Sequence, residues 1–121
     1  MNRILVVDDE PDINLLLMLI LEDSGYQVDV YDDPILALSN FKPSYYDLII
    51  LDIIMPTING FVFYQRIREL DIGIKACFLT VSETSQQEFE KGIYPFVVKE
   101  ELLVRKPILI WINEFFQTPY L

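Results

Sequence analysis

The chain has 121 residues, of which 52% are hydrophobic, and a formal net charge of −10. This length suits one domain, no apolar run reaches the roughly 18 residues of a membrane span, and the acidic balance argues against direct contact with nucleic acid. The absence of histidine excludes Ser-His-Asp and Cys-His catalysis, HExxH zinc sites and a phosphohistidine on this chain. An acidic N-terminus unlike a secretory signal, with Cys77 as the single cysteine, agrees with a location in the cytoplasm.

Short apolar runs alternate with helix-like segments along the chain. In chain order, the sequence predicts strand 3–7, helix 11–25, strand 26–31, helix 32–42, strand 46–52, helix 59–70, strand 75–80, strand 102–106 and helix 107–116. Pro11 and Gly25 mark the two ends of the first helix, and Asp33 is the expected N-cap of the second. This repetition of strand and helix predicts an α/β fold with a parallel sheet covered by helices on both faces.

The first helix carries two apolar stripes. One has the spacing of a core-facing surface and consists of Ile13, Leu16, Leu17, Ile20 and Leu21. The second lies on the opposite side and consists of Leu15, Met18 and Leu19. Two interpretations remain open: the second stripe packs against the apolar last helix on the same face of the sheet, or it forms a docking or homodimer surface.

Five polar residues stand where predicted strands end: Asp8, Asp9, Asp52, Thr80 and Lys106. Right-handed crossovers bring the carboxyl ends of parallel strands to one end of the sheet, where ligands of open α/β sheets bind. Three carboxylates there would suit Mg²⁺, which prefers oxygen ligands. A fixed Asp52 carboxylate beside a cation could attack phosphorus, with Lys106 and Thr80 contacting the transferred phosphoryl oxygens.

Each of these residues also has an ordinary structural interpretation. Asp8 and Asp9 could cap the first helix, and Asp52 could begin a turn. Thr80 could be a solvated turn residue, and Lys106 a solvated charge. Their coincidence at four strand ends favours a shared site.

The segments VVDDEPD, LIILDIIMPTINGF, FLTVSE and RKP resemble the receiver domain of two-component response regulators, in the chemotaxis-regulator-like superfamily. The motifs occur in the family's order and cover nearly the whole chain, from Arg3 to about Phe116. The resemblance implies a flavodoxin-like (βα)5 doubly wound domain over residues 1–121, with five parallel strands in the order 2-1-3-4-5.

The resemblance also implies a function for the acidic residues. Asp52 would accept a phosphoryl group from a sensor histidine kinase, and Asp9, Asp52 and the backbone carbonyl of Ile54 would hold Mg²⁺. Asp8 would contact the ion mostly through water. The chain would then be a phosphorylation-switched signalling module that takes part in its own phosphotransfer and is not an enzyme with a separate substrate.

The region before the last helix departs from the family pattern, and residues 84–101 are expected to be irregular. Lys106 is preferred as the family's lysine, because a proline and an amphipathic helix follow it, and it would pair with the phosphoryl group while Thr80 moves toward it. The rival register places YPFVVK on the last strand and makes Lys99 that lysine. With Lys106, the position of the usual aromatic switch residue is occupied by Leu103.

Three further expectations concern activity and domain organisation. Ile54 and Val81 are apolar and bulky beside the site, which predicts slow loss of the phosphoryl group. A phosphatase like the haloacid dehalogenases is discounted, because the position two residues after Asp52 is Ile54 rather than an aspartate. A degenerate receiver that acts only as a binding or dimerisation module remains an alternative. The sequence has no output motif, so the chain is expected to be either a single-domain regulator or a fragment of a longer chain, and the closeness of Met1 to the first predicted strand favours the single-domain regulator.

Overall fold

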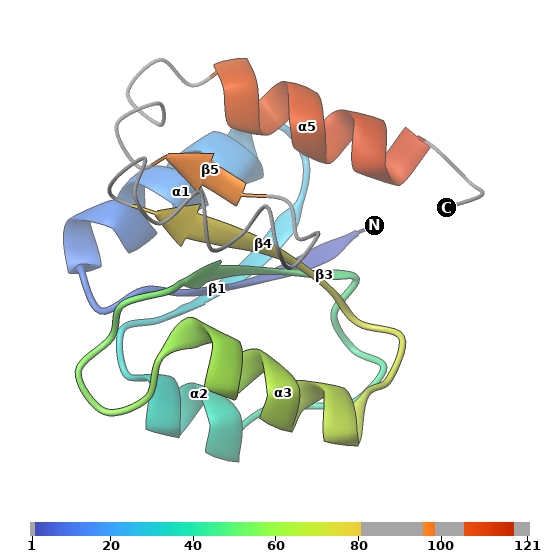
Figure 1. Ribbon diagram of the computed structural model, residues 1–121. Coiled ribbons are helices and arrows are strands. Elements are labelled where there is room, and N and C mark those ends of the chain that lie inside the picture. Colours follow the sequence, from blue (N-terminus) through green and yellow to red (C-terminus); the bar gives the residue numbers. More distant parts are fainter. Residues whose placement is uncertain (1, 81–95, 99–105, 118–121) are drawn as a thin grey trace.

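The computed structural model describes residues 2–80, 96–98 and 106–117. Strands and helices alternate along most of this length (Figure 1). In chain order they are β1 (Arg3–Val7), α1 (Pro11–Asp23), β2 (Gln27–Tyr31), α2 (Pro34–Ser39), β3 (Leu48–Asp52), α3 (Gly60–Leu70), β4 (Lys75–Thr80), β5 (Phe96–Val98) and α5 (Lys106–Gln117).

The strands form one parallel sheet in the order β2-β1-β3-β4-β5. This is the predicted flavodoxin-like order, so the expectation for the fold is confirmed. β1 and β3 lie at the centre and read as continuous apolar runs, because helices cover both faces of such a sheet. All strands end at the same end of the sheet, which is called the carboxyl end below.

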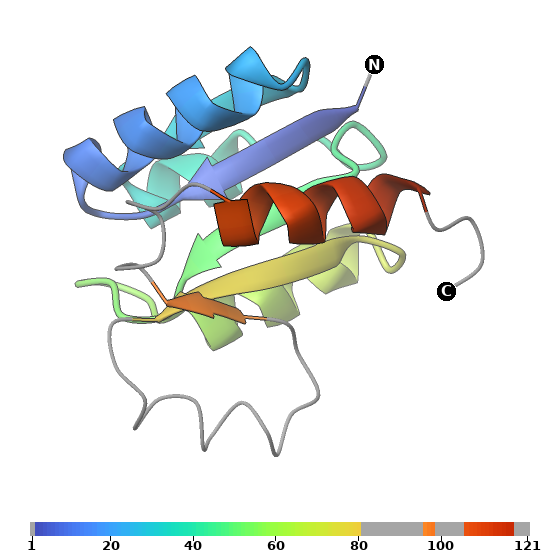
Figure 2. The same cartoon turned by 90° about the horizontal axis from the view of Figure 1, so that it is seen from above.

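Two separate cores pack on the two faces of the sheet. Ile4 and Val6 of β1 pack with Leu17 and Leu21 of α1 on one face, while Leu5 of β1 packs on the other face with residues of α3. α1 and α5 cover the first face, and α2 and α3 cover the second (Figures 1 and 2). The alternation of side chains along each strand therefore fills both layers from one short apolar run.

Side chains cap the N-terminal ends of α2 and α3. Asp33 caps α2 as predicted, since its side chain accepts hydrogen bonds from the N–H groups of Ile35 and Leu36. Asn59 caps α3 by accepting from the N–H of Val62 at 2.9 Å. α2 ends at Ser39, earlier than the predicted limit at residue 42.

The predicted position of the last strand is wrong. β5 is Phe96–Val98 and pairs with β4, whereas Lys106 is the first residue of α5 instead of the last residue of a strand. Phe and Val favour strands, and a proline such as Pro107 fits the first turn of a helix. The strand therefore follows the rival register, in which Lys99 comes next in the sequence.

The two stripes of α1 separate as predicted. Leu17, Ile20 and Leu21 are buried, whereas Leu15 and Leu19 are 51% and 58% exposed. Met18, in the same outer stripe, is partly buried. In the part of the chain that the structure describes, no helix has the length and apolar character needed to cross a membrane.

Candidate functional site

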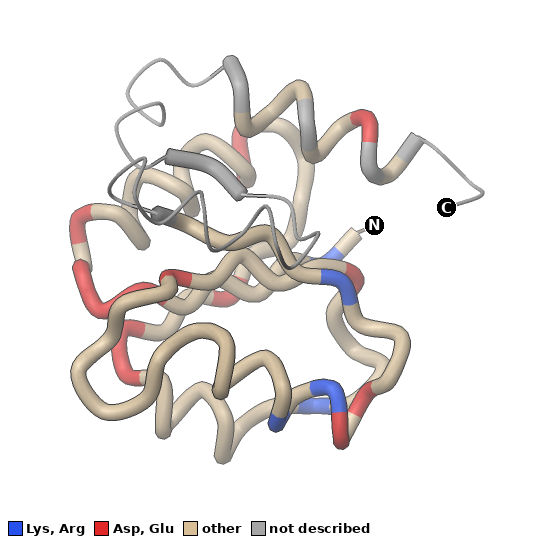
Figure 3. Tube along the Cα trace, viewed as in Figure 1, with Lys and Arg blue, Asp and Glu red and all other residues tan. Residues whose placement is uncertain are grey.

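Two buried aspartates lie side by side at the carboxyl end of the central strands. Val7 of β1 is paired with Leu51 of β3, so the next residues along the two strands, Asp8 and Asp52, lie at the same level. Asp8 is fully buried and Asp52 is 3% exposed. Figure 3 shows acidic residues gathered along this end of the sheet, with the basic residues of the described part mostly at the other end.

Asp8 begins a compact acidic group with its two neighbours. Carboxylate oxygens of Asp8, Asp9 and Glu10 all lie within 4.8 Å of one another. Asp8 Oδ1 accepts a hydrogen bond from the N–H of Glu10 at 2.8 Å. The N-cap of α1 is Glu10, so neither Asp8 nor Asp9 occupies the capping position that the alternative interpretation gave them. The structure adds Glu10 to the predicted set, while Asp52 is not part of this close group.

Asn14 holds in place the loop that carries Asp8, Asp9 and Glu10, called the acidic loop below. Its side chain is buried, and Nδ2 donates to the carbonyl of Asp8 at 2.8 Å and to the carbonyl of Tyr31 at 3.2 Å. One amide thereby ties α1 to the loop after β1 and to the end of β2. Sequence reasoning missed Asn14, because a polar residue within an apolar helix usually faces solvent and backbone partners leave no pattern in the sequence.

The loop after Asp52 returns close to the strand it leaves. The N–H of Gly60 donates to the carbonyl of Ile53 at 2.7 Å. A Cβ on Gly60 would collide with the backbone carbonyl oxygen of Asp52. Glycine is therefore required here for close approach of two backbone segments. Ile54, whose carbonyl was predicted as a magnesium ligand, has a side chain that is 64% exposed.

The remaining predicted site residues are described in part or not at all. Thr80 is the last residue of β4 and is paired with Val98 of β5. Lys106 begins α5, and its side chain and that of Thr80 are outside the described part. Val81 and Leu103, each the subject of a sequence-based prediction, and most of the predicted irregular segment 84–101 also lie outside the described residues.

The donor set at this end of the sheet fits a hard divalent cation. Carboxylate oxygens from two adjacent strand ends are the ligands that Mg²⁺ prefers. Asp52 is buried at the end of the central strand β3, so the packing of that strand fixes its position. The fold and site thus define a doubly wound α/β domain with a group of acidic residues at the carboxyl ends of its central strands.

The comparisons with known proteins identify the family. The family description "Response regulator receiver domain" matches residues 4–105, and the chain belongs to this family of signalling modules. It is 34% identical over 82 residues to the transcriptional regulatory protein TrcR of Mycobacterium tuberculosis, covering 68% of this chain and 32% of TrcR. It is 31% identical to RprY of Bacteroides fragilis, covering 85% of this chain and 47% of RprY. The chain thus spans about a third to a half of these two relatives.

A solved structure agrees with this assignment. The response regulator TrrA of Thermotoga maritima, in complex with Mg²⁺-BeF, aligns with a TM-score of 0.70 and 36% identity, over 81% of this chain and 86% of TrrA. TrrA has also been solved in complex with the histidine kinase ThkA.

Proposed function

We propose that Asp52 accepts a phosphoryl group from a sensor histidine kinase and that this modification switches protein–protein contacts. The observation that carries the proposal is the pair of buried aspartates, Asp8 and Asp52, level with each other on adjacent central strands. Two buried carboxylates so placed are costly without a compensating cation. The solved complexes of TrrA with Mg²⁺-BeF and with a kinase support the same chemistry.

The transfer is a displacement at phosphorus. A carboxylate oxygen of Asp52 forms a new bond to phosphorus as the bond from phosphorus to the kinase imidazole nitrogen breaks, and the electron pair leaves with that nitrogen. Asp9, Asp52 and the carbonyl of Ile54 would hold Mg²⁺, with Asp8 acting mostly through water. When bound, the ion would offset the negative charge of the phosphoryl oxygens. Thr80 would donate its hydroxyl to one of those oxygens.

Two lysines compete for the position opposite the phosphoryl group. The sequence favours Lys106, which Pro107 follows. The pairing of Thr80 with Val98 supports Lys99, because β5 ends at the same end of the sheet as Asp52 and Lys99 is the next residue in the sequence. We therefore extend the proposal to Lys99 and retain Lys106 as the competing assignment.

Loss of the phosphoryl group is expected to be slow. Ile54 presents an exposed apolar side chain two residues after Asp52, and an apolar group there cannot orient an attacking water. An aspartyl-phosphate half-life of seconds would contradict this expectation. Ile54→Asn should shorten the half-life, and Ile72→Asn, which changes another exposed isoleucine, should leave it unchanged.

The outer face of α1 is the proposed contact surface for a partner or a second copy of the chain. Leu15 and Leu19 are exposed, and Met18 lies in the same stripe. Leu15→Glu with Met18→Glu should change the mass measured by size exclusion or the rate of phosphotransfer from a kinase. Unchanged mass and unchanged transfer would remove this part of the proposal, with Ile72→Glu as the control for an added surface charge.

The cytoplasm is the proposed location, supported by a single free, buried thiol at Cys77. Residues 1–121 are proposed to form one receiver domain.

The test of the main proposal is phosphorylation of the purified chain by acetyl phosphate, with and without Mg²⁺, followed by intact mass. We expect a magnesium-dependent gain of one phosphoryl group that Asp52→Asn abolishes and Asp71→Asn, after α3, retains. No gain in the wild-type chain would favour the degenerate receiver that acts only by binding.

A further inference from the structure

β2 leaves one side of its backbone open. It is the first strand in the sheet order, so β1 is its single partner among the described strands. The N–H of Gln27 donates to Asn2, and the carbonyl of Tyr31 accepts from the N–H of Asp8. Because the backbone groups of a strand alternate in direction, the N–H and C=O groups of Val28 and Val30 point away from β1. An exposed row of this kind can pair with another strand.

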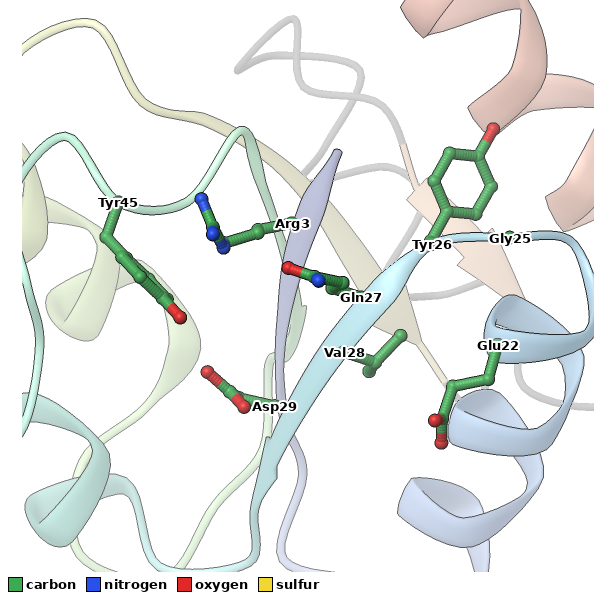
Figure 4. A pocket seen from close by; sticks show the side chains of 8 residues that line it. All are labelled: Arg3, Glu22, Gly25, Tyr26, Gln27, Val28, Asp29 and Tyr45. Carbon is green, nitrogen blue, oxygen red and sulfur yellow. The ribbon is translucent and has the colours of Figure 1, made fainter. Parts of the chain in front are cut away.

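Three pockets follow this open edge. The largest, about 570 Å³, surrounds the start of β2, with Arg3 and Asp29 toward one face of the sheet and Glu22 toward the other (Figure 4). A second pocket of about 460 Å³ lies along Val28 to Tyr31 and is also lined by Lys42 and Tyr46. A third, of about 290 Å³, lies beside the end of the strand on the α1 face and is lined by Leu15, Met18, Val30 and Asp32.

The arrangement of these pockets matches the pattern of an extended chain. Side chains of an added strand point alternately to the two faces of the sheet. The third pocket is on the α1 face, and the second is lined by Tyr46, which belongs to the core on the opposite face. The third pocket, walled by Leu15, Met18 and Val30, suits an apolar side chain. Backbone hydrogen bonds with alternating pockets are the elements of recognition by strand addition.

The charges along the edge decide what can occupy it. Glu22, Asp29 and Asp32 contribute carboxylates to the three pockets. The two cations there, Arg3 and Lys42, both lie over the ring of Tyr45, at 4.5 and 4.8 Å from its centroid. A second copy of β2 would bring its own Asp29 to this acidic edge, and each copy carries a net charge of −10. Like charges on facing strands destabilise pairing, so a basic partner is favoured over self-association.

We propose that the open edge of β2 binds an extended segment of a partner protein, in which lysine or arginine alternates with apolar residues, by adding it to the sheet as a sixth strand. The proposal is independent of phosphorylation at Asp52. It predicts that affinity depends on the outward N–H groups of Val28 and Val30, on the carboxylates beside them, and on ionic strength.

The first experiment selects octapeptides from a random phage-displayed library on the wild-type chain, with counter-selection on Val30→Pro. Proline removes one outward N–H, and it is tolerated on edge strands. Enriched peptides should alternate basic and apolar residues, and a synthetic copy should bind Val30→Pro about three- to tenfold more weakly than Val30→Thr, which keeps the N–H. No enrichment, or equal binding to the two variants, would overturn the proposal.

Three further measurements keep the result independent of how well Val30→Pro folds. Methylation of alternate backbone nitrogens in the synthetic peptide should abolish binding to the wild-type chain, and the bound peptide should slow hydrogen exchange at Val28 and Val30. Asp29→Lys should weaken the binding of the same peptide, whereas Asp71→Lys should leave its binding unchanged. If sedimentation instead shows dimers that Val30→Pro dissociates, the edge serves self-association and the assignment to a basic partner is wrong.

Discussion

At the scale of single residues, the position of Asp52, the proposed phosphoacceptor, depends on a missing side chain. A methyl group at Gly60 would meet the carbonyl oxygen of Asp52, which is backbone and cannot move without shifting β3. Gly60→Ala should therefore lower the free energy of unfolding by about 1–3 kcal/mol and slow phosphorylation by acetyl phosphate. Gly73→Ala is the matched control, because nothing lies within 4 Å of its added Cβ. Equal stability of the two variants in urea denaturation would show that the loop accommodates the methyl group.

Asn14 positions the acidic loop rather than touching the reacting atoms. Asn14→Ala removes the donor for two backbone carbonyls, those of Asp8 and Tyr31, and should cost about 1–3 kcal/mol of stability. Magnesium affinity, measured by titration, should also fall because the carboxylates are less well held. Asn40→Ala loses a similar bond to Leu36 on the exposed surface, and should leave magnesium affinity unchanged. A loss of stability with normal magnesium affinity would make Asn14 a purely structural residue.

Cys77 gives the fold a specific sensitivity to alkaline pH. Burial raises the pKa of its thiol to about 12 from an ordinary value of 9.0. Between these values the unfolded thiol loses its proton while the folded thiol keeps it, so stability falls as pH rises from about 9 toward 12, by up to about 1.4 kcal/mol per pH unit. Cys77→Ala should be less stable at neutral pH but should lose stability less steeply above pH 9. Parallel slopes in urea denaturation for the two proteins would contradict this account.

At the scale of elements, the strands differ in how well their positions could be predicted from the sequence. β1, β3 and β4 could be predicted because each is a continuous apolar run buried on both faces. β5 has three residues, and apolar residues occur both there and at 102–104. The choice between these two runs depends on pairing with β4, which local sequence does not encode. The carboxylates of the site were correctly located at strand ends, whereas Asn14 and the contact at Gly60 involve backbone partners that no side-chain pattern reports.

The position of β5 leads to a prediction about the two lysines. Lys99 follows the strand that pairs with Thr80, so Lys99→Ala should slow phosphorylation by acetyl phosphate at least about tenfold, as expected for the loss of one charge-assisted contact to the phosphoryl group. Lys106→Ala should have a smaller effect, and Lys91→Ala is a control for the loss of one positive charge. If Lys106→Ala is the slower variant, the assignment from the sequence is right despite the position of the strand.

At the scale of the whole molecule, the uneven distribution of charge is expected to link the stability of the fold to the proposed binding of magnesium. The chain carries a net charge of −10, and the carboxylates of Asp8, Asp9 and Glu10 lie together at the carboxyl end of the sheet. Repulsion within this group destabilises the folded state, and functional sites commonly reduce stability in this way. Added salt screens repulsion between charges over the whole surface, whereas a bound cation offsets the negative charge of these three carboxylates directly.

This difference predicts how the melting temperature responds to ions. In EDTA at low salt, Asp9→Asn should melt at a higher temperature than the wild-type chain, because one of three adjacent charges is gone. Millimolar Mg²⁺ should raise the wild-type melting temperature by mass action, beyond the effect of NaCl at equal ionic strength. In Asp9→Asn, Mg²⁺ and NaCl at equal ionic strength should change the melting temperature by the same amount. In Asp71→Asn, Mg²⁺ should raise the melting temperature beyond the effect of NaCl, as in the wild type. An equal response of the wild type to Mg²⁺ and NaCl would mean that the carboxylates respond to screening alone and hold no cation.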